Sequence, residues 1–219
     1  MPFNTMSISC VILCGGRSSR MGQDKALLEF GSMSLAEFVY NRLSKGFKQT
    51  LLCTKSPDER FSALNLPLLI ESKQQPDYQD ASLFSPLFGI KSALVYALKN
   101  KSKYVAIASV DSPFITPWHF QQLFGQIKSS PETQVGYITQ ILANNQRKEH
   151  FLISLWHTST LDSLNKALKA QDLKVSKLID SLSHLSLELD DNTLSFNLNT
   201  LQDYQNAQIA LQSHEINKE

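Results

Sequence analysis

Apolar runs and amphipathic segments alternate along the first half of the chain. Runs of consecutive apolar residues predict buried strands, and segments with apolar residues three and four apart predict helices. The predicted strands are 8–13, 49–54, 66–71 and 104–110. The predicted helices are a short turn at 24–30, a helix capped by Ser34 that ends near Gly46, one opened by Ser56 and Pro57, and one with the buried stripe Leu87, Ile90, Leu94 and Leu98. Strand and helix in alternation predict a mostly parallel sheet.

The second half keeps the alternation but adds a hairpin-like pair. Residues 134–142 and 151–156 read as strands joined by the polar turn 143–148, which predicts a locally antiparallel part of the sheet. The remaining predicted elements are helices at 118–127, 161–168, 175–182 and 201–211 and a strand at 185–189. We therefore predict an α/β fold: a single Rossmann-like, three-layer domain over 1–212 with a mostly parallel, mixed central sheet, followed by a frayed tail, 213–219.

Composition and charge restrict the partners. The chain has 219 residues and a formal net charge of +1, so it has no bulk attraction for nucleic acid or an anionic membrane surface. Three cysteines (Cys10, Cys14 and Cys53) form no CxxC and cannot all pair, so we expect apolar fillers rather than a zinc site or disulfide framework. No basic leader precedes the first apolar run, which predicts a cytoplasmic protein.

The first predicted strand ends in a glycine-rich loop that carries several cations. Gly15 and Gly16 can leave backbone N–H groups free for an anion, and Arg17, Arg20 and Lys25 follow within the loop. Five residues separate Gly16 from Gly22 and Lys25 comes later, so the loop is not a P-loop. It also lacks the G-x-G-x-x-G spacing of dinucleotide-binding folds. Several donors and charges together suit a triphosphate.

The loop closely resembles the L-x-G-G-x-S-x-R-M-G-x-D-K signature of nucleotidyltransferases. The matching residues are Leu13, Gly15, Gly16, Ser18, Arg20, Met21, Gly22, Asp24 and Lys25. The double glycine resembles, within that superfamily, the molybdenum cofactor guanylyltransferases. Segments 86–89, 111–114 and 197–200 also resemble that family, although Ser85 replaces the usual glycine directly before the first of these segments.

This resemblance implies an enzyme that transfers GMP from GTP to the terminal phosphate of molybdopterin and releases pyrophosphate, with Mg²⁺ as cofactor. It also implies molybdoenzymes or their chaperones as protein partners. Two alternatives stay open on the sequence. One is a cytidylyltransferase or sugar-phosphate nucleotidyltransferase of the same fold, and the other is a nucleotide-binding maturation module without catalysis.

The resemblance assigns roles to individual residues. Lys25 and Arg20 would lie against the phosphates, and Asp111, after the strand 104–110, would bind Mg²⁺. The loop itself would hold the nucleotide, with Leu13, Cys14 and Gly15 along the guanosine, Gly15 and Gly16 offering amides, and Gly22 closing the loop.

Other candidates bind the base or the acceptor. Guanine presents N–H donors on one edge, so its pocket needs an acceptor, for which Glu71 or the weaker Ser72 is the candidate. Cys53 stands where the family has asparagine. The resemblance places Asn197 and Asn199 at the acceptor, while an asparagine before a helix is also a common N-cap. His150 keeps the histidine of the family's His-Pro pair, but Phe151 replaces the proline.

Overall fold

A seven-stranded mixed sheet forms the centre of the protein. The computed structural model describes residues 6–15, 24–55, 57–71, 85–142, 145–190 and 197–216. The strands lie in the order β5-β4-β1-β6-β8-β7-β9. Their bounds are β1 Met6–Leu13, β4 Phe47–Thr54, β5 Leu68–Ile70, β6 Tyr104–Ser109, β7 Val135–Ile141, β8 Arg147–His157 and β9 His184–Glu188. Only β8 runs antiparallel to its neighbours, β6 and β7, so the mostly parallel, mixed sheet is confirmed.

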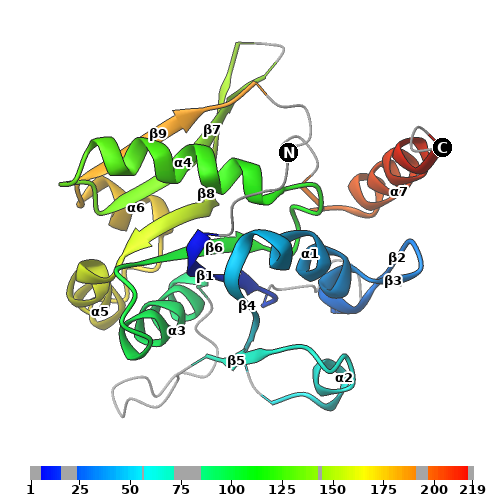
Figure 1. Ribbon diagram of the computed structural model, residues 1–219, viewed down its shortest axis with the longest axis horizontal. Coiled ribbons are helices and arrows are strands. Elements are labelled where there is room, and N and C mark those ends of the chain that lie inside the picture. The colour runs from blue at the N-terminus through cyan, green and yellow to red at the C-terminus, as the bar shows by residue number, and fades with distance from the viewer. Residues whose placement is uncertain are drawn as a thin grey trace.

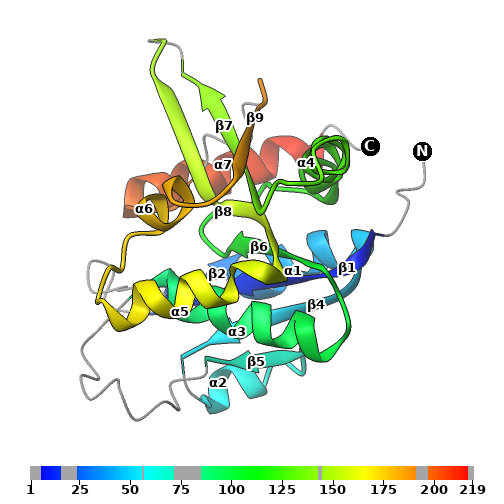
Figure 2. The same cartoon turned by 90° about the vertical axis from the view of Figure 1, so that its left-hand side faces the viewer.

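Helices cover both faces of this sheet (Figures 1 and 2). One face packs against α1 Leu35–Leu43, α4 Pro117–Ser129 and α7 Leu201–Ile216. The other packs against α3 Pro86–Lys99, α5 Leu161–Lys169 and α6 Val175–Asp180. The layers are therefore helix, sheet and helix, as predicted. Among the helices of the described segments, none is both long and apolar enough to cross a membrane.

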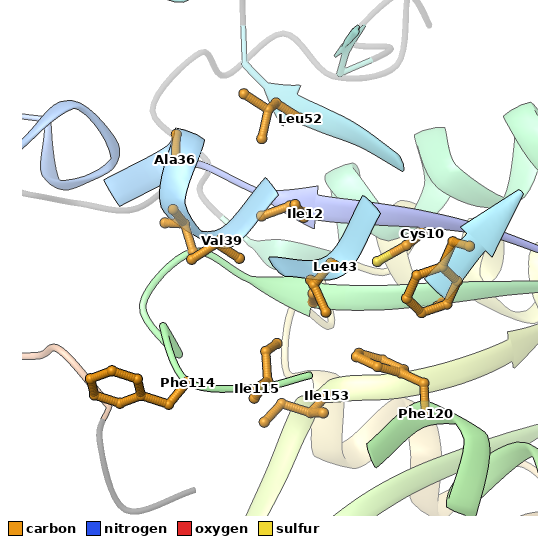
Figure 3. Close-up of a cluster of buried hydrophobic side chains, with 14 of the residues drawn as sticks. Cys10, Ile12, Ala36, Val39, Leu43, Leu52, Phe114, Ile115, Phe120 and Ile153 are labelled. Atoms are coloured by element: carbon orange, nitrogen blue, oxygen red, sulfur yellow. The ribbon is translucent and has the colours of Figure 1, made fainter. Parts of the chain in front are cut away.

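The core on the α1 side explains why these residues form these elements. Alternate residues of β1, Cys10 and Ile12, are fully buried against α1 (Figure 3). The helix presents Ala36, Val39 and Leu43 at the spacing of one helical face. Burying such side chains stabilises the fold by roughly 1.5–3 kcal/mol for each large one. The alternate residues of β1 and the residues of one face of α1 thus form a single buried apolar layer.

Local hydrogen bonds set where the helices begin. Ser34 Oγ accepts from the Glu37 amide at 3.3 Å, while the Glu37 carboxylate accepts from the Ser34 amide at 2.9 Å, which is a capping box. Ser85 Oγ accepts from the Leu87 amide at 3.1 Å and so caps α3. Ser85, where the family has glycine, therefore has a helix-capping role in this chain.

Several boundaries differ from the sequence prediction. The short helix α2 (Glu59–Ser62) is capped by Asp58, and Ser56 lies outside the described residues. Leu98 is 47% exposed, so its place in the buried stripe of α3 was wrong. The chain also forms a hairpin of two-residue strands, β2 (Glu29–Phe30) and β3 (Met33–Ser34), which was not predicted.

The C-terminal helix is longer than predicted. α7 continues to Ile216, beyond the predicted end at Leu211. Ala207 and Leu211 bury their side chains in the α1-side cluster, which holds the helix to the rest of the chain.

Alanine substitutions at two glycines, Gly46 and Gly125, should change the free energy of unfolding in opposite directions. A methyl group at Gly46 would overlap Cβ and Cγ of the rigid Pro117 ring, whereas one at Gly125, inside α4, would meet nothing within 4 Å. We expect Gly46→Ala to lower the free energy of unfolding by about 1–3 kcal/mol through overpacking. Gly125→Ala should raise it by roughly 0.5–1 kcal/mol, because alanine is the better helix residue.

Urea denaturation of the two variants beside the parent measures both shifts. Equal stability of the two variants would show that the approach of residue 46 to Pro117 is not as close as described.

Candidate active site

The candidate site lies at the carboxyl edge of the sheet, where β1 lies between β4 and β6. The chain moves from β1 to β4 and β5 on one side and then to β6 on the other, so β1 and β6 form a topological switch point. Two backbone hydrogen bonds hold the strand ends together: the Cys14 amide donates to the Cys53 carbonyl at 2.9 Å, and the Val110 amide donates to the Leu13 carbonyl at 3.2 Å. The glycine loop and Asp111 therefore leave neighbouring strands at one edge.

Asp111 and Lys25 meet through the segment that precedes α7. The Leu198 amide donates to the Asp111 carbonyl at 2.8 Å, and Lys25 Nζ donates to the Leu198 carbonyl. Asp24 orients the lysine, because its carboxylate accepts from the Ala26 amide at 3.2 Å and caps the short 3₁₀ turn Lys25–Leu27. Three stretches that are far apart in the sequence thus join in one hydrogen-bonded chain.

Glu71 lies on the other side of Gly15. Its amide donates to the Thr54 carbonyl at 2.8 Å, which extends the pairing of β4 and β5. Its Oε1 lies 3.6 Å from the point where a Cβ of Gly15 would stand and 3.4 Å from the same point of Gly89. A carboxylate oxygen therefore lies between two glycines, one after β1 and one in the first turn of α3.

Gly89 also brings α3 close to the first strand. A Cβ there would lie 2.7 Å from Leu13 Cδ2 and 3.6 Å from Cys53 Sγ. Leu13, Cys53 and Glu71 therefore gather beneath the start of α3, as the glycine-rich segment of that helix allows.

Lys55 is a site residue that sequence reasoning missed. Its Cγ and Cε each lie 3.4 Å from the would-be Cβ of Gly15. It lines a cavity of about 180 Å³ beside the glycine loop, together with Cys14, Gly15, Asp24, Thr54, Asp58 and Phe61. Lys55 directly follows β4 as Glu71 follows β5. Ligands of open α/β sheets bind beyond the carboxyl ends of the strands, so this position is the signal that could have selected Lys55.

The two asparagines before α7 differ in surroundings. Asn197 Oδ1 is buried without a hydrogen-bond partner among the described residues. Asn199 is exposed, and its amide donates to Asp203 Oδ2 at 3.0 Å. Thr200, rather than Asn199, forms the cap, since its hydroxyl accepts from the Asp203 amide at 3.1 Å and its own amide donates back to the carboxylate at 2.8 Å.

The Asp203 carboxyl group has a lowered pKa and favours the ionised form. Desolvation acts to raise its pKa, but hydrogen bonds from Thr200 and Asn199 and the charge of Lys25 outweigh it and hold the pKa below its ordinary value. An ionised Asp203 therefore fixes the start of α7 close to the lysine.

The cysteines are buried and free, as expected of apolar fillers. Burial, followed by the Glu71 carboxylate, raises the pKa of the Cys53 thiol, and burial, followed by Cys53 and Asp24, raises that of Cys14. Because both stay protonated near neutral pH, neither is an activated nucleophile.

His150 is buried in β8, with 6% of its surface exposed, opposite Ile138 of β7. Its Nε2 has no hydrogen-bond partner within the described segments. Burial, followed by the charges of Lys148 and His119, lowers the pKa of His150 to about 4. The ring is therefore neutral at physiological pH.

Several predicted site residues lie outside the described residues. They are Gly16, Arg20, Gly22 and Ser72. The described part of the site is thus Leu13, Cys14, Gly15, Lys25, Glu71, Asp111 and the two asparagines, with Lys55 added.

Comparison with known proteins gives the family. A profile of the MobA-like NTP transferase domain matches residues 10–185. The chain belongs to this family. It is 38% identical over 205 residues to a molybdenum cofactor guanylyltransferase of Helicobacter pylori strain G27, covering 91% of this chain and 90% of that protein.

Solved structures show the same fold. Molybdopterin-guanine dinucleotide biosynthesis protein A from Archaeoglobus fulgidus superposes with a TM-score of 0.74 at 18% identity, covering 94% of this chain and all of that one. A 4-diphosphocytidyl-2C-methyl-D-erythritol synthase from Anaerococcus prevotii gives 0.70 at 14% identity, covering 94% and 96%. The family profile and the H. pylori relative, rather than these structures, show that the chain is a nucleotidyltransferase, so the predicted enzyme class is confirmed.

The buried His150 predicts a pH dependence of stability. Its pKa of about 4 lies below the ordinary 6.5, so the unfolded chain binds the proton more readily than the folded one. The stability that the folded chain gains from a neutral His150 is therefore fully present above pH 6.5 and is lost as pH falls toward 4. By linkage, this loss lowers the free energy of unfolding at pH 5 by on the order of 2 kcal/mol.

Urea denaturation at pH 7.5 and pH 5 measures this loss in the parent and in His150→Gln, whose side chain does not titrate. The parent should lose more stability than the variant. Identical losses would show that His150 is not kept neutral by burial.

Proposed function

We propose that this nucleotidyltransferase transfers GMP from GTP to the terminal phosphate of molybdopterin and releases pyrophosphate. An acceptor phosphate oxygen forms a bond to the α-phosphorus, the bond between the α-phosphorus and the bridging oxygen of the β-phosphate breaks, and that oxygen leaves with pyrophosphate. The similar H. pylori protein is named for this activity, and the similarity covers 90% of its length. The observation that carries the proposal in this chain is the position of Glu71 between Gly15 and Gly89.

Glu71 gives the site an acceptor for guanine. The N1–H and N2–H₂ groups lie on one edge of guanine, and a carboxylate accepts from both. Neither glycine presents a side chain to Oε1, which lies 3.6 Å from the would-be Cβ of Gly15 and 3.4 Å from that of Gly89. Adenine would leave the carboxylate without donors at N1, and a buried unpaired acceptor is costly.

Lys25 supplies positive charge where the triphosphate would lie. Its ammonium donates a hydrogen bond to the Leu198 carbonyl, and the 3₁₀ turn that Asp24 caps restrains its backbone. A positioned cation stabilises the charge that spreads over the transferring phosphoryl group. We infer that Arg20 and the amides of Gly15 and Gly16 share this role.

The residues at the strand end fit a magnesium ion. No cluster of three or more histidine, cysteine or acidic side chains exists within the described segments, so a metal cage made of protein alone is absent there. Mg²⁺ instead needs one or two carboxylates together with substrate phosphates and water. Asp111, partly exposed at the edge of the sheet, offers such a carboxylate, with Ser112 Oγ donating to its Oδ1 at 3.3 Å. Bound there, the ion would neutralise triphosphate oxygens.

Asn197 suits the acceptor side. Its buried, unpartnered Oδ1 stands next to Leu198, which bonds the Asp111 backbone. We infer that this amide contacts the acceptor and that Asn199, exposed at the start of α7, assists it.

Base selectivity tests the proposal. Pyrophosphate release with molybdopterin should be fastest with GTP, exceeding ATP by about tenfold to a hundredfold. Glu71→Gln should narrow this preference, because its amide presents a donor where guanine needs an acceptor. The matched control is Glu59→Gln, an exposed glutamate in α2, which should leave the ratio unchanged.

Faster pyrophosphate release with CTP than with GTP would indicate a cytidylyltransferase and overturn the proposal. Nucleotide binding without pyrophosphate release from any triphosphate would indicate a binding module and overturn the proposal.

Removing the Asp111 charge tests the metal site. Asp111→Asn should reduce pyrophosphate release at least about a hundredfold at low Mg²⁺, and excess Mg²⁺ should restore part of it, because an amide oxygen binds the ion weakly. Asp162→Asn makes the same chemical change at an exposed position of α5 and should keep the parental Mg²⁺ dependence. A variant at residue 111 with parental Mg²⁺ dependence would remove this residue from the metal site.

A further inference from the structure

A second cavity lies at the opposite edge of the sheet. Its volume is about 600 Å³, and Ile8 near the start of β1 is part of its wall. The candidate active site begins at Cys14, at the other end of that strand, on the order of 20 Å away at the rise of a β-strand. Small-molecule sites in proteins have volumes of about 300–1,000 Å³. The cavity is therefore large enough for a ligand and separate from the nucleotide site.

The charge of this cavity has one sign. Lys101, Lys103 and Lys128 line it, and no described acidic side chain does. In a protein with a formal net charge of +1, three ammonium groups at one cavity are a local concentration of charge. Clustered like charges repel one another, and a bound anion relieves that repulsion. The chemistry of the wall selects a ligand with phosphate-like charge.

The three lysines come from fixed backbone positions. Lys101 has φ 56°, in the left-handed region where lysine is uncommon. The amides of Lys101 and Ser102 donate to the Leu98 and Ala97 carbonyls at 3.0 and 2.9 Å, closing the end of α3. Lys128 Nζ lies 4.6 Å from the centre of the Phe124 ring, a cation–π contact. These contacts hold the backbone at Lys101 and the ammonium of Lys128 in the wall.

Aromatic rings form the rest of the wall. Tyr104 packs edge-on against Phe124 and His157, with ring centres 5.9 and 4.8 Å apart. All three residues line the cavity. Such rings favour stacking or edge contacts with a flat ligand.

His157 adds a neutral donor. The Ser159 amide donates to its Nδ1 at 3.2 Å, so Nδ1 carries the lone pair and the proton of the neutral ring is on Nε2. Partial burial, and then the charge of Lys103, lowers the pKa of His157 and favours this neutral form. An N–H donor therefore accompanies the ammonium groups.

We propose that this cavity is a second ligand site that binds a small phosphorylated molecule with an aromatic ring, of the chemical class of a nucleoside monophosphate. The lysines and His157 take the phosphate, and Tyr104 and Phe124 take the ring. Strands β1 and β6 each contribute a wall residue here, Ile8 and Tyr104, and each ends beside the candidate active site, whereas α3 ends just before the wall residue Lys101.

The experiment follows the His157 ring by NMR in the full chain, without Mg²⁺, during titration with GMP, guanosine or inorganic phosphate. His157→Gln assigns the resonance among the five histidines. GMP should shift it saturably and bind at least about tenfold more tightly than either fragment, because it engages both walls. Lys25→Ala, altered at the candidate active site, should show the same shift, which separates this site from the proposed function.

Reversing the charge of the lysines that line the cavity tests whether they bind the ligand. Lys103→Glu combined with Lys128→Glu should weaken GMP binding at least about tenfold, and the milder Lys101→Ala should weaken it by about threefold. Lys166→Glu, the same change at an exposed position of α5, should keep parental binding. Absence of a saturable shift, or unchanged binding in the double variant, would overturn the proposal. Phosphate binding as tightly as GMP would overturn the role of the aromatic rings.

Discussion

The backbone hydrogen bonds between the ends of β4, β1 and β6 are the constraint on which the candidate site depends. Through them the Cys14 amide is bonded to the Cys53 carbonyl and the Val110 amide to the Leu13 carbonyl. The chain segments that begin at residues 14 and 111 therefore leave the sheet at adjacent points, and the bond from the Glu71 amide to the Thr54 carbonyl adds the segment that begins at residue 71. A side chain on a loop has little positional precision of its own, but here each loop begins within one or two residues of a paired strand. The sheet supplies the precision, and the loops supply the chemistry.

Much of this arrangement follows from local sequence signals. Continuous apolar runs placed the parallel strands, and Ser34 placed the start of α1, because capping satisfies the same amides in any surroundings. Asp111 could be selected because it directly follows such a run, and Glu71 because it ends one and offers the acceptor that guanine needs. What failed needed tertiary information. Leu98 keeps the helical spacing but stands in the last turn of α3, where its side chain is 47% exposed.

Other features gave too weak a signal to be predicted. The hairpin of β2 and β3 has two residues in each strand, which is shorter than any periodicity can reveal. Lys55 carries no motif, and its position directly after β4 is a weak signal until the approach of its side chain to Gly15 is known. The link from Lys25 to Leu198 joins residues 173 positions apart, and no local pattern encodes such a contact.

The two edges of the sheet also differ in electrostatic design. At the carboxyl edge, Lys25 and Lys55 share their region with Asp24, Glu71 and Asp111, so positive and negative groups are interleaved. A nucleotide with a metal ion carries both signs, and such a mixed edge can meet phosphate and cation together. At the amino edge, the described charges around the larger cavity are lysines alone. An overall charge of +1 therefore hides two local environments. Since the screening length is about 8 Å at physiological salt, each edge acts on a ligand through its own charges rather than through the total.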